Sequence, residues 1–127
     1  MDTKVADPLR GAVIGGRYRI MGRLASGRTT SVYQARDERL DRSVAIRIIN
    51  PEYVLDSEVL DRLNTEAQTV AHLGHPNVVA VFDQGSHEGA PYIVMEYVRG
   101  RALRDVLAER GRLDPIESLA ITEQVLA

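Results

Sequence analysis

The chain has 127 residues, a net charge of −2 and no cysteine. Its length suits one domain or part of a larger one. The near-balanced charge argues against nucleic acid and anionic membrane surfaces as partners, and the lack of cysteine excludes disulfides, thiolate nucleophiles and cysteine-ligated zinc. No apolar run is long enough to cross a membrane and no signal peptide is visible, so we expect a cytoplasmic location. We predict no metal site within the chain.

The first part of the chain is predicted to contain a lead-in and three strands. Residues 1–14 are polar and aperiodic, which is typical of a flexible tail. β-Branched and aromatic residues then predict strands over 18–24, 31–36 and 44–49. Small polar residues join the first two strands and charged residues join the second to the third. Three consecutive strands with short connections favour an antiparallel meander.

A helix is predicted after the third strand. Apolar residues at helical spacing begin near Asp56 and Ser57, either of which suits an N-cap, and the pattern ends at Gly74. Two further strands and two short helices are expected after it, over residues 78–83, 92–97, 103–110 and 115–127. The glycine-containing segment 84–91 is expected to form the hairpin loop between the two strands.

Two charges occupy positions that are predicted to be buried. Arg47 lies in the middle of the apolar strand 44–49, and Glu66 lies on the apolar stripe of the helix. A buried charge is costly unless it has a partner, and arginine can bind a carboxylate with two hydrogen bonds. Two interpretations stay open. The pair is either a structural tie between helix and sheet, or a cation for a ligand phosphate with the carboxylate holding it in place.

Five motifs occur in a fixed order: Leu24-x-x-Gly27 through Val32-Tyr33, Val44-Ala45-Ile46-Arg47, Glu66 in the helix, His75-Pro76-Asn77-Val78-Val79, and Tyr92-Ile93-Val94-Met95-Glu96-Tyr97-Val98. Because it has these motifs in this order, the chain resembles the N-terminal lobe of a protein kinase, and more narrowly the bacterial eukaryotic-like (Hanks-type) Ser/Thr kinases. The resemblance runs from about Gly16 to Ala127. It implies an α+β fold, with a five-stranded antiparallel sheet and one packed helix over 15–98. The hinge exit and an incomplete start of the C-terminal lobe would follow over 99–127.

The resemblance also implies an ATP site. Apolar side chains would enclose the adenine ring, with Met95 as the gatekeeper beside Leu24, Val32 and Ala45. Backbone groups would contact the adenine edge from Glu96 and Val98. A small polar loop would arch over the phosphates, formed by Ala25, Ser26, Gly27, Arg28, Thr29, Thr30 and Ser31. Arg47 stands where the family has the lysine that holds the α- and β-phosphates, and Glu66 is the helix glutamate that normally pairs with that lysine.

Two departures from the family pattern fall within the lobe. The phosphate loop has Ala25, Gly27 and Thr30 where the family has Gly-x-Gly-x-x-Gly, so close approach of the backbone to phosphate relies on one glycine. Arg47 replaces the lysine. Because arginine is longer and planar, it should pair well with Glu66 but serve the phosphates less well.

A third departure concerns the second lobe. The His-Arg-Asp-x-x-x-x-Asn and Asp-Phe-Gly motifs do not occur, so this chain is expected to lack the catalytic base and the metal ligands. Magnesium is expected only in a two-lobe parent.

Three functions are compatible with these residues. The chain could be the ATP-binding front part of a Ser/Thr kinase, inactive as it stands, in which the parent transfers phosphate from ATP to protein Ser/Thr. It could instead be a pseudokinase lobe that acts as a protein-docking or regulatory binding module, or a decayed gene remnant. The apolar faces of the last two helices are expected to be exposed, which would favour self-association or a protein partner. The resemblance also implies a homodimer through the N-terminal lobe, because relatives in the family pair in this way.

Overall fold

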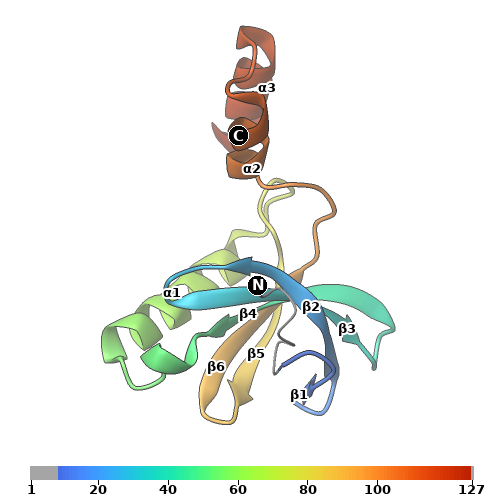
Figure 1. Cartoon of the computed structure of the whole chain (residues 1–127), viewed down its shortest axis with the longest axis vertical. Helices are drawn as coiled ribbons and strands as arrows, with labels where there is room; N and C mark the ends of the chain where they lie inside the picture. Colours follow the sequence, from blue (N-terminus) through green and yellow to red (C-terminus); the bar gives the residue numbers. More distant parts are fainter. Residues whose placement is uncertain (1–8, 127) are drawn as a thin grey trace.

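The computed structural model describes residues 9–126, which form an antiparallel sheet, one helix packed against it and two further helices (Figure 1). The strands are β1 (Val13–Ile14), β2 (Tyr18–Ser26), β3 (Thr30–Asp37), β4 (Arg42–Ile49), β5 (Val81–His87) and β6 (Ala90–Glu96). The helices are α1 (Ser57–Leu73), α2 (Leu103–Arg110) and α3 (Pro115–Leu126). The strand order across the sheet is β1-β2-β3-β4-β6-β5, and α1 lies in the connection from β4 to β5. The predicted α+β fold is confirmed. Among residues 9–126, no helix has both the length and the apolar character needed to cross a membrane.

The described sheet has one strand more than the sequence predicts. Val13 and Ile14 form β1 by pairing with Arg19 and Tyr18 of β2, and Ile14 is fully buried. Two residues are too few for an alternating pattern to be visible, so the sequence assigned them to the lead-in. Ordered structure therefore begins earlier than expected, while residues 1–8 of the predicted tail lie outside the described part.

The hairpin between β5 and β6 turns at Glu88 and Gly89, which corrects the longer loop predicted from the sequence. Both residues have positive φ, 49° and 82°, as a two-residue type I′ turn requires. Gly85 had the character of a loop residue, but it pairs with Tyr92 inside the ladder. A Cβ at Gly85 would lie 2.7 Å from the Tyr92 hydroxyl oxygen. The strand has glycine here because a core tyrosine occupies the space.

Helix α1 is capped as the sequence predicts. The Asp56 carboxylate accepts hydrogen bonds from two backbone N–H groups of the first turn, at 3.0 and 3.2 Å. Gly74 ends the helix in the left-handed conformation, with φ of 54°. The turn that follows extends through Val78, whose N–H donates to the His75 carbonyl. For this reason β5 begins at Val81, three residues later than expected.

The two faces of the sheet pack against different partners. The sheet is curled, and the side chains on its inner face pack against one another. They form a core of Ile14, Tyr18, Ile20, Tyr33, Ala35, Val44, Ile46, Ile48, Tyr92 and Val94. The other face receives α1, and its core is Ile49, Val59, Leu63, Ala67 and Ile93. Because side chains alternate along a strand, Arg47 lies on the same face as Ile49, the face that carries α1.

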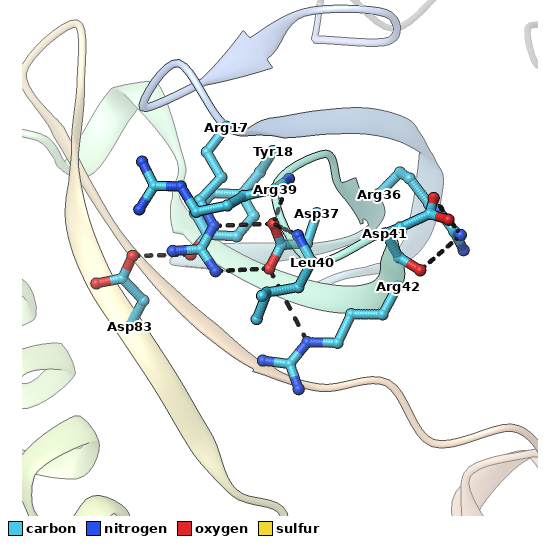
Figure 2. A network of polar contacts seen from close by, with 9 residues as sticks. All are labelled: Arg17, Tyr18, Arg36, Asp37, Arg39, Leu40, Asp41, Arg42 and Asp83. Atoms are coloured by element: carbon cyan, nitrogen blue, oxygen red, sulfur yellow. Dashed lines mark hydrogen bonds and ion pairs between the residues drawn. The ribbon is translucent and has the colours of Figure 1, made fainter.

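A buried carboxylate fixes the turn between β3 and β4 (Figure 2). The Asp37 side chain is 1% exposed and accepts two hydrogen bonds from Arg17, through Nε and Nη2, both at 2.8 Å. The backbone N–H groups of Arg39 and Leu40 also donate to Asp37 Oδ1, at 3.0 and 3.2 Å. The Arg17 guanidinium, helped by these N–H groups, holds the pKa of Asp37 well below its usual range.

The same polar network extends to β4 and β5 (Figure 2). The Tyr18 hydroxyl donates to Asp83 Oδ2 at 2.8 Å, and burial together with this hydrogen bond raises the pKa of Tyr18. Arg42 Nε lies 3.9 Å from Asp37 Oδ2, while its guanidinium carbon lies 4.0 Å from the centre of the Phe82 ring. Polar contacts therefore join four strands at one end of the sheet.

Helices α2 and α3 extend away from the sheet (Figure 1). Asp114 caps α3 and accepts the N–H of Glu117 at 2.8 Å. Asn77 Nδ2 donates to the Gln124 carbonyl at 2.8 Å and ties α3 to the turn after α1. The expected exposure of apolar side chains on α3 is present, at Ile116, Leu119, Val125 and Leu126.

Candidate functional site

Strand register brings three of the predicted adenine-binding residues onto one face of the sheet. Val32 of β3 pairs with Arg47 of β4, and Ala45 of β4 pairs with Met95 of β6. Directly opposed residues of antiparallel strands point to the same side, and Ala45 and Arg47 are two residues apart. Val32, Ala45, Met95 and Arg47 therefore share the face that carries α1. We call the apolar three of them, Val32, Ala45 and Met95, the adenine face.

Leu24 lies at the edge of this face. It is the extra residue of a β-bulge in β2, between Arg23, which pairs with Tyr33, and Ala25, which pairs with Val32. Its side chain is 48% exposed, whereas Ala45 is 6% exposed. The face thus has a buried centre and an exposed border.

The two residues predicted to contact the adenine edge lie at the end of β6, where Glu96 is the last residue of the strand and Val98 comes after it. The backbone N–H of Glu96 donates to the Ala80 carbonyl at 2.9 Å, and the Glu96 carboxylate accepts the Ala80 N–H at 3.2 Å. The Glu96 N–H is therefore not available to a ligand. Val98 lies after the end of β6 with its side chain 59% exposed.

The predicted phosphate loop is shorter than expected because both flanking strands extend into it. β2 continues through Ser26 and β3 begins at Thr30, so only residues 27–29 lie outside the strands. The Gly27 N–H donates to the Thr30 carbonyl at 2.8 Å, and a Cβ on Gly27 would lie 3.0 Å from that oxygen. The tight turn explains why the single remaining glycine stands at this position.

Asn50, at the end of β4, holds this loop in place. Its side-chain Nδ2 donates to the carbonyl oxygens of Gly27 and Arg28, each at 3.0 Å, and its backbone N–H donates to the Thr29 carbonyl at 2.8 Å. Its Oδ1 accepts the Ser31 hydroxyl at 2.7 Å. The predicted strand over 44–49 ends just before Asn50, and the sequence gives this residue no role. The available signal for its role was a polar residue directly after an apolar strand. This signal does not indicate which groups the side chain of Asn50 contacts.

The expected ion pair between Arg47 and Glu66 is not formed among the described residues. Arg47 Nη1 instead donates to Thr30 Oγ1 at 3.2 Å. Two departures from the family pattern, the arginine and the threonine, thus contact each other. Arg47 and Glu66 line the same cavity of about 140 Å³ between the sheet and α1, together with Val70 and Met95.

Glu66 lies beside the buried stripe of α1. The stripe consists of Val59, Leu63 and Ala67, at intervals of four residues. Glu66 lies three residues after Leu63, about 60° from it around the helix axis, and lines the cavity that Arg47 also lines. Glu66 is exposed at the border of the stripe, which corrects the prediction that it lies on the packing face.

We expect the Glu66→Ala change to alter the free energy of unfolding by less than about 0.5 kcal/mol, because an exposed side chain without an ion pair contributes little. Leu63→Ala, on the buried stripe, is the matched control and should cost about 2–4 kcal/mol. Urea unfolding of both variants checks the comparison. A loss above about 2 kcal/mol for Glu66→Ala would show that its carboxylate is paired in solution.

Comparison with known proteins agrees with this geometry. Residues 18–127 match the family model of the protein kinase domain. The chain is 41% identical over 120 residues to serine/threonine-protein kinase PknL of Mycobacterium tuberculosis, covering 94% of this chain and 30% of that protein. It is 42% identical over 119 residues to serine/threonine-protein kinase PrkC of Bacillus subtilis, covering 94% of this chain and 18% of that protein.

A solved structure gives the same result for the fold. The crystal structure of the M. tuberculosis PknI kinase domain superimposes with a TM-score of 0.77 at 28% identity, covering 94% of this chain and 48% of that one. The chain thus spans about half of that kinase domain and less than a third of PknL and PrkC. The matched residues contain the adenine face, the loop at residues 27–29 and helix α1. The chain belongs to the protein kinase domain family, as an N-terminal part related to bacterial serine/threonine kinases.

Proposed function

We propose that this lobe binds ATP, with the base on the adenine face and the phosphates beside the loop at residues 27–29. The observation that carries the proposal is the register of β3, β4 and β6, which gathers Val32, Ala45 and Met95 from three strands onto one face. The small Ala45 side chain leaves room above a buried surface for a flat ring. Leu24 covers the border of the same face from the bulge of β2.

The phosphate end of the site combines the Arg47 cation with a tight loop that itself carries Arg28. Arg47 holds its guanidinium beside Thr30, at the start of β3, where it can attract an anionic oxygen. Gly27 lets the chain turn tightly at the same end. ATP therefore fits the residues present, with an apolar part and a positively charged part at the expected ends.

The proposed reaction of a protein that contains this lobe with a complete second lobe is phosphoryl transfer from ATP to serine or threonine of a protein substrate. The lobe would hold and orient the nucleotide. We assign no magnesium ligand to this lobe. Within residues 9–126, no group of three or more histidine, aspartate or glutamate side chains is arranged to hold a metal ion.

A second candidate function is that of a pseudokinase lobe, which binds a nucleotide or a protein without supporting transfer. The contact between Arg47 and Thr30 favours it, because the cation at the family's lysine position is held by the loop rather than by Glu66. Phosphate transfer to a protein by a two-lobe protein containing this sequence would decide for the kinase. Binding without transfer would decide for the pseudokinase.

Calorimetric titration of the chain with ATP tests the binding proposal. Ala45→Leu adds bulk at the centre of the adenine face and should lower the affinity for ATP at least about tenfold, since the larger side chain occupies the space of the adenine ring. Ala71→Leu adds the same side chain at an exposed position of α1 and is the control. If Ala45→Leu binds ATP as the parent chain does, or if the parent does not bind ATP, the proposed site is wrong.

A further inference from the structure

We propose that Asn50 is a positioning residue for phosphate. In this inference it sets the direction of two consecutive peptide groups in the loop, so that their N–H groups face away from it and can receive an anionic oxygen. The inference rests on the proposed binding of ATP at the adenine face. It concerns a residue outside the glycine pattern by which phosphate loops are identified in a sequence.

The first step is the way Asn50 is itself held. Its backbone N–H donates to the Thr29 carbonyl at 2.8 Å, and its own carbonyl accepts the N–H of Tyr53 at 2.9 Å. Its side-chain oxygen accepts the Ser31 hydroxyl at 2.7 Å, which leaves the amide nitrogen directed at the loop. Asn50 is therefore fixed by its backbone and by its side-chain oxygen, and its amide nitrogen remains for the carbonyl groups of the loop.

The second step is the direction of the loop peptides. Asn50 Nδ2 donates hydrogen bonds to the carbonyl oxygens of Gly27 and Arg28, each at 3.0 Å, so both oxygens face Asn50. In a trans peptide the carbonyl and the next N–H point in opposite directions, and the described chain contains no cis peptide. The N–H groups of Arg28 and Thr29 must therefore point away from Asn50.

The third step is the availability of these two donors. Within residues 9–126, neither the Arg28 N–H nor the Thr29 N–H donates a hydrogen bond to another protein group. Successive N–H groups that point to one side form a concave site that favours an anion. Arg47, which contacts Thr30 at the next position, adds a positive charge at the same end of the loop.

The fourth step is the composition of the loop. Ala25 and Thr30 stand where the family pattern has glycines, so only Gly27 gives the backbone unusual freedom. A loop with one glycine has fewer ways to arrange its N–H groups around a phosphate by itself. The side chain of Asn50, directly after β4, fixes the direction of the loop peptides in place of the missing glycines.

Three variants separate the contacts of Asn50. Asn50→Asp keeps an acceptor for Ser31 but removes both donors to the loop carbonyls. Asn50→Ala removes all three side-chain hydrogen bonds. Ser31→Ala removes only the hydroxyl bond that orients the Asn50 side chain and leaves the amide donors in place. Asn64→Ala, at an exposed asparagine of α1, is the matched control. Circular dichroism confirms that each variant is folded, and each is titrated with ATP and with adenosine, which lacks phosphates.

We expect Asn50→Asp and Asn50→Ala to weaken ATP about tenfold, while adenosine changes less than about twofold, because only the phosphate contacts depend on the loop. Asn64→Ala should bind both ligands within about twofold of the parent chain, and Ser31→Ala should weaken ATP less than the two Asn50 variants do. A merely structural role for Asn50 would weaken ATP and adenosine equally. That result, or unchanged ATP affinity in both Asn50 variants, would overturn the inference and leave the proposed function standing.

Backbone ¹⁵N relaxation of the free chain gives a test without ligand. The amides of Arg28 and Thr29 should be as rigid as their strand neighbours in the parent chain and in Asn64→Ala, and mobile in both Asn50 variants. Equal rigidity in all four proteins would overturn the inference, whatever the chain binds. A parent chain that binds neither ATP nor adenosine would overturn the proposed function, and with it the phosphate role of Asn50, even where the relaxation result shows that the loop is held.

Discussion

Asp37→Asn is expected to lower the free energy of unfolding by about 3 kcal/mol at neutral pH, because it leaves buried donors without their anionic partner. The Asp37 carboxylate is 1% exposed and accepts hydrogen bonds from Arg17 and from two backbone N–H groups. An amide at this position would place an NH₂ group against the guanidinium. Urea unfolding at pH 7 measures the loss.

Asp41→Asn is the matched control for this prediction. Asp41 lies in the same turn and also pairs with an arginine, Arg36 at 2.7 Å, but its side chain is 89% exposed. Asparagine tolerates the positive φ of 55° at this position. We expect a change below about 0.5 kcal/mol, as for other exposed ion pairs. Equal losses for the two variants would mean that burial of Asp37 is not what makes its contacts stabilising.

The stabilisation from Asp37 should also depend on pH. Since the folded chain holds the pKa of Asp37 below its usual range, its contribution is complete above the unfolded pKa of about 3.9 and declines as pH falls below that value. The difference in stability between the parent chain and Asp37→Asn should therefore be constant near neutral pH and narrow below about pH 4. An unchanged difference from neutral to strongly acidic pH would contradict this assignment.

Arg47→Ala is expected to weaken ATP by about tenfold to a hundredfold, because a hydrogen bond to a charged group contributes about 1.5–3 kcal/mol. Adenosine should bind as before. Arg47→Lys keeps the charge, releases Thr30 from its contact, and should bind ATP at least as tightly as the parent chain. Arg62→Ala, at an exposed position of α1, controls for the loss of one positive charge. The measurement is calorimetric titration with both ligands.

Two outcomes would contradict the role given to Arg47. If Arg47→Ala and Arg62→Ala weaken ATP equally, only the overall charge matters. If Arg47→Lys binds ATP much more weakly than the parent chain, the arginine makes a specific contact that a point charge cannot replace, and Thr30 is not its main partner when nucleotide is bound.

Elements defined by local patterns could be predicted from the sequence. Strands β2, β3 and β4 follow runs of β-branched and aromatic residues, and α1 has its caps at Asp56 and Gly74. Each of these signals lies within a few residues of the element that it defines. The resemblance to the kinase family could be identified for the same reason, because its motifs are short and ordered.

Features that depend on distant residues could not be predicted. Gly85 belongs to β5 because Tyr92 needs its space, and β1 is stabilised mainly by the buried Ile14. The pairing of Arg47 with Thr30 and the hydrogen bonds of Asn50 depend on side-chain directions after folding. A sequence shows which residues carry charge or polar groups, but not which of several neighbours they contact.

The most direct test of ATP binding at the adenine face is an NMR titration of the ¹⁵N-labelled chain with ATP. The account predicts saturable shifts in the amide signals of Val32, Ala45 and Met95, and in those of Arg28 and Thr29 in the loop. Amide signals from residues whose side chains lie in the core on the opposite face, such as Tyr18 and Ile20 in β2, should move little. No saturable shift, or saturable shifts confined to residues outside the adenine face and the loop, would contradict the account.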